Sequence, residues 1–431
     1  MTDDKKPIGL WSAIAIGIGA MVGAGIFSIL GVAAQIAGNA MWISFTIAGA
    51  VTLLSTYSFA KLGTTYPSAG GPVEYLVRGF GDNAVSGGFN IVLWVSYVFA
   101  LALYARAFGA YAVTFLPPGA PRVWINIFAT AVIVVFAAVN FFGARAVGRT
   151  ERAIVAVKVG ILIAFVAVGL LFIQPERLSP SFWPPGSNVF LGAAIIFVAY
   201  QGFALITNAA SDMDDFKRTL PRALYLSVLI VLCLYVAVSV TVVGNLPIPQ
   251  IIGAKDSALA QATQPFLGSL GFEAIAIAAL FSTASGINAT LYGSAKVSYM
   301  LAKYREIPSL SELGVWRRST EGLFVTAGLA LLFVNVFDLS SIAVLTSAAI
   351  LIIYTVVNVA HMRLYATTGA RRAVIGATVV TCLVFLGALI YYEAGASPGA
   401  LSSLFIVLVA CFVGEVIYRR HAHLAVAPPP F

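Results

Sequence analysis

Long apolar segments, separated by short polar connections, follow one another along most of the chain. A segment of about 20 apolar residues is long enough to cross a bilayer as a helix. In lipid, each such segment must satisfy its backbone hydrogen bonds internally, so only a helix or a closed barrel is possible, and these runs are too long and too uniformly apolar for barrel strands. We expect twelve membrane-spanning helices, at residues 10–34, 41–62, 84–114, 124–143, 150–173, 189–210, 221–243, 265–302, 321–336, 339–361, 373–392 and 400–418.

Composition supports an integral membrane protein. Hydrophobic residues make up 60% of the 431 positions and charged residues only 10%, and the mean hydropathy is +0.96. These values exclude a water-soluble protein. The connections are too short to hold a separate soluble domain, so we expect residues 1–431 to form a single membrane domain. The first apolar segment is too long for a signal-peptide core and is interpreted as a membrane helix.

The distribution of basic residues predicts the orientation, because lysine and arginine are retained on the cytoplasmic side. With the N-terminus inside, the outer connections hold only Arg122, Arg177 and Lys255 of the 25 basic residues. Three more lie inside spans, and the other 19 fall in cytoplasmic segments. We therefore expect a multi-pass protein of the cell membrane with both termini in the cytoplasm. The net charge of +8 reflects this topology and not a nucleic-acid surface.

The reactive residues do not form a catalytic or metal-binding pattern. An intramembrane enzyme needs a cluster such as paired aspartates, a serine with a histidine, or a metal triad. The three histidines lie at the cytoplasmic edge or in the tail, and the three cysteines are widely separated. We therefore expect no enzyme activity, cofactor, metal site or obligatory protein partner. A channel or a receptor remains an alternative, although interrupted helices fit a closed binding site better than a continuous pore.

Two spans have compositions that favour interruption of the helix. The first carries Gly17, Gly19, Gly23 and Gly25 within GIGAMVGAGIF, and the sixth carries polar residues in FVAYQGFALITN. Glycine lowers helix propensity by about 1 kcal/mol relative to alanine, and an unwound segment at membrane depth exposes backbone groups that can bind a substrate. Close packing through small residues is the alternative. Spans one and six would occupy corresponding positions if five-helix units repeat with inverted topology.

Lys158 lies about eight residues into the fifth span, within AIVAVKVGILIAF. A charged lysine inside the bilayer costs at least about 3 kcal/mol unless it faces a cavity or a partner. Removal from water favours the neutral amine, so this residue is a candidate for gaining and losing a proton during transport. The alternative is a side chain that extends toward the cytoplasmic interface.

Four motifs in sequence order resemble the amino acid, polyamine and organocation transporter superfamily, above all its prokaryotic proton-coupled members. These are GAMVGAGIF in span one, YPSAGGPVEYLVRGFG after span two, FVAYQGF in span six and the Pro221, Arg222, Ala223 start of span seven. The resemblance implies two inverted five-helix repeats, residues 10–173 and 189–361, with peripheral helices within 373–418. This is a fold similar to that of the leucine transporter, with helices 1 and 6 broken at the midplane.

The resemblance also implies a substrate site. The amides of Ala24 and Gly25 would bind the substrate carboxylate at a positive helix end. The carbonyls of Val22, Val198, Ala199 and Gln201 would hold the α-ammonium, with Tyr200 and Phe203 as an aromatic wall. The complete expected binding set is Val22, Gly23, Ala24, Gly25, Ile26, Val198, Ala199, Tyr200, Gln201, Gly202 and Phe203.

Proton coupling follows from the same resemblance. The Lys158 ammonium would occupy the space that a sodium ion fills in sodium-coupled relatives, with Gly19, Ser282 and Ser285 as partners. Where relatives often carry an acidic residue in span six, this chain has Ala204, which disfavours cationic substrates. We therefore expect proton-coupled symport of small neutral amino acids such as alanine by alternating access. An amino acid or amine exchanger is the first alternative, and sodium coupling ranks below it.

Overall fold

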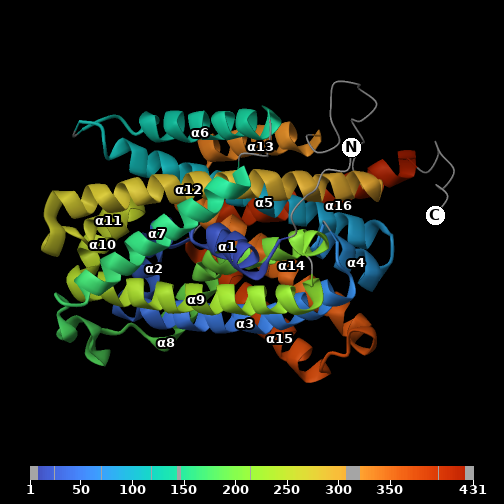
Figure 1. Ribbon diagram of the computed structural model, residues 1–431, viewed down its shortest axis with the longest axis horizontal. Coiled ribbons are helices and arrows are strands. Elements are labelled where there is room, and N and C mark those ends of the chain that lie inside the picture. Colours follow the sequence, from blue (N-terminus) through green and yellow to red (C-terminus); the bar gives the residue numbers. More distant parts are fainter. Residues whose placement is uncertain are drawn as a thin grey trace.

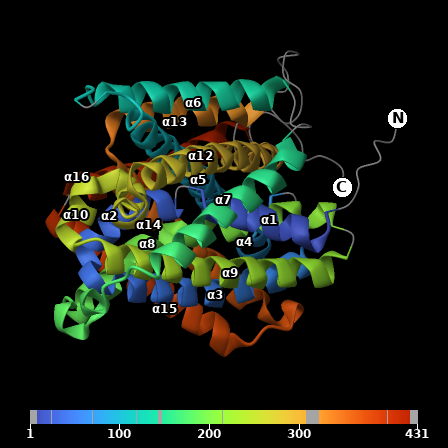
Figure 2. The ribbon, with the colours of Figure 1, turned by 60° about the vertical axis from the view of Figure 1, so that its left-hand side comes forward.

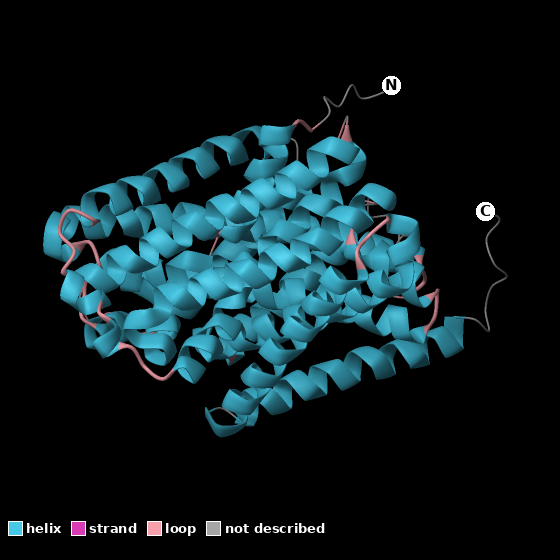
Figure 3. Ribbon diagram, turned by 90° about the horizontal axis from the view of Figure 1, so that it is seen from below, coloured by secondary structure: helices cyan, strands magenta, loops and turns pink. Residues whose placement is uncertain are grey.

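The structure is a computed structural model, and its described residues form helices joined by loops and turns (Figure 3). The described residues are 8–23, 25–68, 70–117, 119–142, 147–213, 215–306, 321–396 and 398–422. Within these ranges no strand occurs. The arrangement fits a lipid environment, because a helix satisfies its own backbone hydrogen bonds.

Each expected apolar segment coincides with one helix or with two consecutive ones. The first segment is divided into α1 (Leu10–Met21) and α2 (Gly25–Ala37), and the sixth into α8 (Gly186–Ile196) and the 3₁₀ helix η4 (Phe197–Asp212). The remaining ten are α3 (Met41–Thr65), α5 (Ala84–Val113), α6 (Val123–Phe142), α7 (Val147–Gly169), α9 (Phe216–Asn245), α12 (Gln264–Lys303), α13 (Glu321–Val336), α14 (Leu339–Thr368), α15 (Arg372–Ala396) and α16 (Pro398–Ala422).

Short helices occupy several connections between the long ones. The glycine-rich segment after α3 leads into α4 (Pro72–Phe80), and the expected outer connection after α9 contains α10 (Ile248–Ala254), η5 (Lys255–Ser257) and α11 (Ala258–Gln261). Three further 3₁₀ turns are η1 (Gly38–Ala40), η2 (Pro175–Leu178) and η3 (Pro180–Phe182). None of these elements is long enough to cross a bilayer.

The described residues contain nine helical segments that are long and apolar enough to span a membrane. Three shorter apolar helices, Leu10–Met21, Ala153–Gly169 and Gly322–Val336, accompany them. The chain is therefore a multi-pass membrane protein, as the hydrophobic pattern predicts. The exact count of twelve spans and the division into two inverted repeats remain predictions.

The first helix lies in the interior of the bundle. Helix α1 packs against α7, α9, α12 and η4, and Figure 1 shows it between α9 on one side and α12 on the other. Helices α6 and α13 pack together along one edge, and α15 lies at the opposite edge (Figures 1 and 2). The interruption between α1 and α2 is thus surrounded by other helices.

The sixth segment differs from its expected form. The sequence predicts a break, but the backbone continues as a 3₁₀ helix from Phe197 to Asp212, directly after α8. A 3₁₀ run of this length is unusual because its hydrogen bonds have poorer geometry, and such stretches often mark hinges or strain. The polar and glycine residues of FVAYQGF thus lie within a continuous 3₁₀ helix, and the expected break does not occur there.

Candidate functional site

The end of α1 exposes a row of backbone carbonyls inside the protein. The last carbonyls of an α-helix have no partner within the helix. In α1 these include Gly19, Ala20 and Met21, and the following residue Val22 caps the helix by donating its N–H to Ile18. Because these residues are buried, their carbonyls need partners from other parts of the chain.

Four different helices supply these partners. Lys158 of α7 donates to Gly19 at 2.8 Å, and the Tyr104 hydroxyl of α5 donates to Ala20 at 3.1 Å. The Tyr235 hydroxyl of α9 donates to Met21 at 2.6 Å. Ser282 of α12 donates to Val22, and its oxygen lies 3.2 Å from the Gly23 carbonyl. Four consecutive carbonyls are thus each bound by a side chain from a different helix.

Lys158 is buried at the end of this row. Its side chain is 1% exposed, so it does not extend to the membrane surface. Besides donating to Gly19, its ammonium lies 3.5 Å from the Ser285 hydroxyl of α12. The Lys158 amine of α7 thus contacts both α1 and α12. Ser282, the other serine expected near Lys158, binds one turn further along the break.

The 3₁₀ helix η4 contributes a second set of carbonyls. The Tyr235 hydroxyl lies 3.3 Å from the Ala199 carbonyl, and Tyr354 of α14 donates to Gln201 at 2.9 Å. At Gly202 the helix η4 meets the end of α1, since a Cβ there would lie 2.5 Å from the Ala20 carbonyl carbon and the Met21 nitrogen. Only glycine permits this approach of two backbones.

The start of α2 completes the break. A helix N-terminus presents free N–H groups and a partial positive charge, which suit a carboxylate. Gly25 and Ile26, which form the first turn of α2, are buried, and Ala24 lies outside the described residues. A Cβ on Gly25 would lie 2.8 Å from the Tyr235 hydroxyl and 3.0 Å from Ala199. Little room is therefore present beside this helix end.

The two aromatic residues of the expected wall lie in the interior. Phe203 packs edge-on against Phe59 and Tyr354, with ring centroids 5.2 and 5.4 Å away. The Tyr200 hydroxyl donates to the Phe45 carbonyl of α3 at 2.9 Å. Both residues, like Val198, are buried. Phe203 belongs to an aromatic cluster beside Gln201, whereas Tyr200 connects η4 to α3.

Sequence reasoning missed the tyrosines that bind the end of α1 and η4. Tyr104, Tyr235 and Tyr354 all lie in apolar helices and are buried, so their rings resemble ordinary core residues in the sequence. A buried tyrosine hydroxyl, however, usually needs a hydrogen-bond acceptor. A tyrosine in the middle of a membrane span therefore indicates a nearby acceptor. In the structure the acceptors are backbone carbonyls at the end of α1 and in η4.

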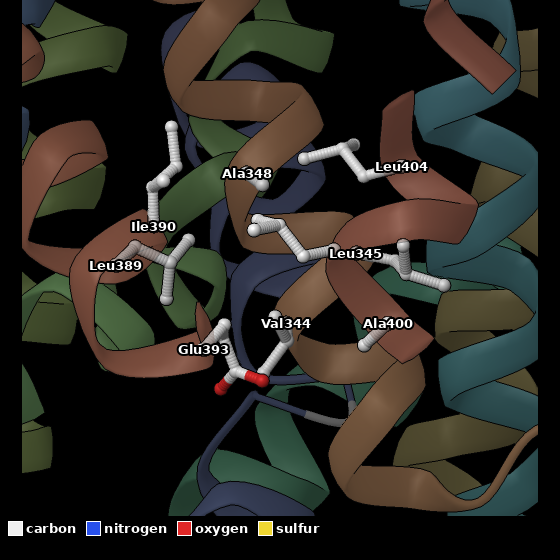
Figure 4. A pocket seen from close by; sticks show the side chains of 9 residues that line it. Val344, Leu345, Ala348, Leu389, Ile390, Glu393, Ala400 and Leu404 are labelled. Carbon is white, nitrogen blue, oxygen red and sulfur yellow. The ribbon is translucent and has the colours of Figure 1, made fainter. Parts of the chain in front are cut away.

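A small apolar pocket elsewhere in the fold is not part of this site. It lies between α14, α15 and α16 and is lined by eight apolar residues and Glu393. In Figure 4 the carboxylate lies at the edge of the group, beside Val344. None of the lining residues belongs to the break. Among the described residues, no group of three or more histidine, cysteine, aspartate or glutamate side chains could hold a metal ion.

Sequence comparison identifies the family. The sequence model described as "Amino acid permease" matches residues 8–416. The chain belongs to the amino acid permease family. Its place in the amino acid, polyamine and organocation superfamily, expected from the four motifs, is thereby confirmed. The family consists of transporters, so this permease is a multi-pass membrane transporter.

Curated relatives align with this permease over most of their length. An uncharacterized protein of Methanocaldococcus jannaschii is 41% identical over 420 residues, which cover 96% of each chain. The inner membrane transport protein YbaT of Escherichia coli is 36% identical, over 89% of this chain and 90% of its own. The branched-chain amino acid permease BcaP of Bacillus subtilis is 26% identical, over 72% of this chain and 70% of its own.

Proposed function

We propose that this permease carries small neutral amino acids together with protons across the cell membrane by alternating access. The observation that carries the proposal is Lys158, a buried amine that donates to Gly19 at the end of α1 and lies 3.5 Å from Ser285 of α12. A protonated lysine is both a cation and a donor of three hydrogen bonds. The charged form strengthens the connection between α1 and α12, and loss of the proton weakens it.

The substrate would bind between the break that separates α1 from α2 and the 3₁₀ helix η4. Its carboxylate would accept hydrogen bonds from the amides at the start of α2, and its ammonium would donate to carbonyls of Val22, Val198, Ala199 or Gln201. The Gln201 carbonyl already accepts from the Tyr354 hydroxyl, and the Ala199 carbonyl lies 3.3 Å from the Tyr235 hydroxyl. A carbonyl has two lone pairs, so it can accept a second donor or exchange one donor for another.

Two features favour a small, neutral side chain. Gly25 and Gly202 are in close contact with neighbouring groups, which limits the volume beside the break. The position after the Gly202–Phe203 pair is Ala204, which is 5% exposed. An alanine offers no charge to meet a cationic substrate, and leaving such a charge unpaired in a buried site is costly.

The proposal includes the architecture and the orientation. Two inverted repeats, residues 10–173 and 189–361, would bring α1 and the segment α8 to η4 into equivalent positions, with α15 and α16 outside the core. Helix α1 begins and α16 ends toward the same end of the bundle (right in Figures 1 and 2). We place this end in the cytoplasm, in keeping with the basic residues of the connections.

The test is uptake of radiolabelled alanine into proteoliposomes under an imposed inward proton gradient or an imposed inward sodium gradient. We expect proton-driven accumulation that is lost in Lys158→Ala and retained in Lys217→Ala, a control at an exposed lysine of α9. Accumulation driven only by sodium, or Lys158→Ala that still concentrates alanine under a proton gradient, would refute proton coupling through Lys158. Counterflow without any dependence on pH would favour an exchanger.

A further inference from the structure

A second titratable cluster lies far from the helix break, at the end of α12. The chain leaves this helix through Arg305, whose φ of 56° is left-handed. The N–H of Glu306 then donates to Leu301 at 2.8 Å and that of Arg305 to Ala302 at 3.0 Å. This pattern is a Schellman motif, which usually has glycine at the left-handed position. The motif turns the chain so that Glu306 is buried, at 1% exposure.

Helices α5 and α16 enclose the Glu306 carboxylate. The side-chain amide of Asn90 in α5 donates to both carboxylate oxygens, at 2.9 and 3.1 Å. The guanidinium of Arg419 in α16 lies 3.9 Å away, but it is closer to two other carboxylates. It lies 2.7 Å from Asp82 and 2.5 Å from Glu415. The guanidinium of Arg419 is thus shared among the carboxyl groups of Asp82, Glu306 and Glu415.

The cluster contains fewer hydrogen-bond donors than acceptors. Glu415 Oε2 and Asn90 Oδ1 are buried and have no hydrogen-bond partner, and the side chains of Glu306 and Glu415 are both 0% exposed. A buried acceptor without a donor is costly. A carboxylate only accepts hydrogen bonds, whereas a carboxylic acid also donates one. One added proton would therefore supply a donor and reduce the negative charge.

Electrostatics favour proton binding at Glu306. The pKa of this carboxyl group is raised to about 7, chiefly by burial; the hydrogen bond from Asn90 and the charge of Arg419 oppose the rise, and the charges of Glu415 and Asp82 add to it. Two further titratable residues come just before Glu306 in the chain. Arg305 precedes it directly, and the Tyr304 hydroxyl donates to the Glu74 carboxylate. A site of this kind gains or loses its proton near neutral pH.

We propose that Glu306 is a proton-binding site separate from Lys158, in which the acid form of Glu306 supplies the donor that the cluster with Asn90, Glu415, Asp82 and Arg419 lacks. The two sites are distant, because α12 continues from Ser285 for 18 residues to Lys303 before the turn to Glu306, which is about 27 Å at the rise of an α-helix. Proton binding here stabilises the contact of α12 with α5 and α16, at the end of the bundle that we place in the cytoplasm.

Thermal unfolding of the detergent-solubilised permease between about pH 5 and about pH 9 tests this site without a transport assay. A carboxyl group whose pKa is raised in the folded state loses stabilisation as the pH rises toward that value. Wild type should therefore lose several degrees of its unfolding temperature as the pH rises to about 7. In Glu306→Gln, which cannot ionise, this decline should disappear. The control Asp215→Asn, at an exposed carboxylate, should retain the wild-type decline.

Two neighbouring substitutions should shift the midpoint of the decline of unfolding temperature with pH in opposite directions. They also test the site if Glu306→Gln fails to fold. Asn90→Ala removes donors that favour the charged form, so the midpoint should move to higher pH. Glu415→Gln removes a negative neighbour, so the midpoint should move to lower pH. An unchanged decline in Glu306→Gln, or an unchanged midpoint in both neighbouring variants, would overturn the assignment. Because Lys158 is intact throughout, these outcomes are independent of proton-coupled transport.

Discussion

The hydroxyl of Tyr235 donates a 2.6 Å hydrogen bond to the carbonyl of Met21, the last residue of α1. The same hydroxyl lies 3.3 Å from the Ala199 carbonyl of η4. One side chain from α9 therefore contacts both the end of α1 and η4. Since the substrate ammonium is proposed to bind the Ala199 carbonyl, Tyr235 both connects α1 with η4 and competes with the ammonium for that carbonyl.

The first prediction concerns Tyr235→Phe, which removes only the hydroxyl. The Met21 carbonyl then loses its donor inside the protein, at a cost of about 1–3 kcal/mol. We expect a lower unfolding temperature and alanine transport reduced at least about fivefold, the lower end of that range. Tyr391→Phe, at a tyrosine that is 86% exposed, should behave like wild type. Equal transport by the two variants would show that the Tyr235 hydroxyl is dispensable.

The second prediction concerns the crossing of the two backbones at Gly202. A methyl group there would lie 2.5 Å from backbone atoms of Ala20 and Met21, and backbone cannot move aside as a flexible side chain can. Gly202→Ala should therefore destabilise the protein and abolish uptake. Gly387→Ala is the matched control, because nothing lies within 4 Å of the added methyl group in α15. Normal uptake by Gly202→Ala would contradict this close crossing.

The third prediction distinguishes two adjacent hydroxyls of α12. Ser282 donates to Val22 at the break, whereas Thr283 donates to Ala279 of its own helix at 2.7 Å. Ser282→Ala should raise the KM for alanine, because the local geometry of the break is no longer held from α12. Thr283→Val, which retains the shape of the side chain, should leave the KM unchanged. Equal KM values for both variants would exclude a special role for Ser282.

The fourth prediction separates coupling from binding. Lys158→Arg retains a positive charge, but arginine does not lose its proton in proteins. If proton release from Lys158 drives the cycle, this variant should fail to accumulate alanine under an inward proton gradient. Lys217→Arg, at an exposed lysine, should accumulate alanine normally. Full accumulation by Lys158→Arg would contradict a role for the release of this proton.

The sequence predicts the helices well because lipid leaves few alternatives. A run of about 20 apolar residues must form a helix in a bilayer, and each expected segment coincides with helical structure. The glycines of the first span also predict its interruption, which lies between Met21 and Gly25. Local composition was sufficient for these two features.

Other features depend on tertiary contacts and could not be predicted in this way. The conversion of the sixth segment into a 3₁₀ helix accompanies its crossing of α1 at Gly202. The partners of the exposed carbonyls lie on helices distant in sequence, as Tyr104 and Tyr235 illustrate. Glu306 was not singled out, because its burial depends on the left-handed turn at Arg305. Hydrophobic periodicity contains no information about such pairings.

The row of carbonyls from Gly19 to Val22 has a consequence for the way in which α1 can move. Its four donors come from α7, α5, α9 and α12, and each hydrogen bond contributes about 1 kcal/mol. Rotation or tilting of this one turn shifts all four acceptors together, so the donors cannot release it one at a time. We therefore expect the movement of α1 to be cooperative: the turn either keeps its whole set of partners or exchanges the whole set, and partly released states are rare.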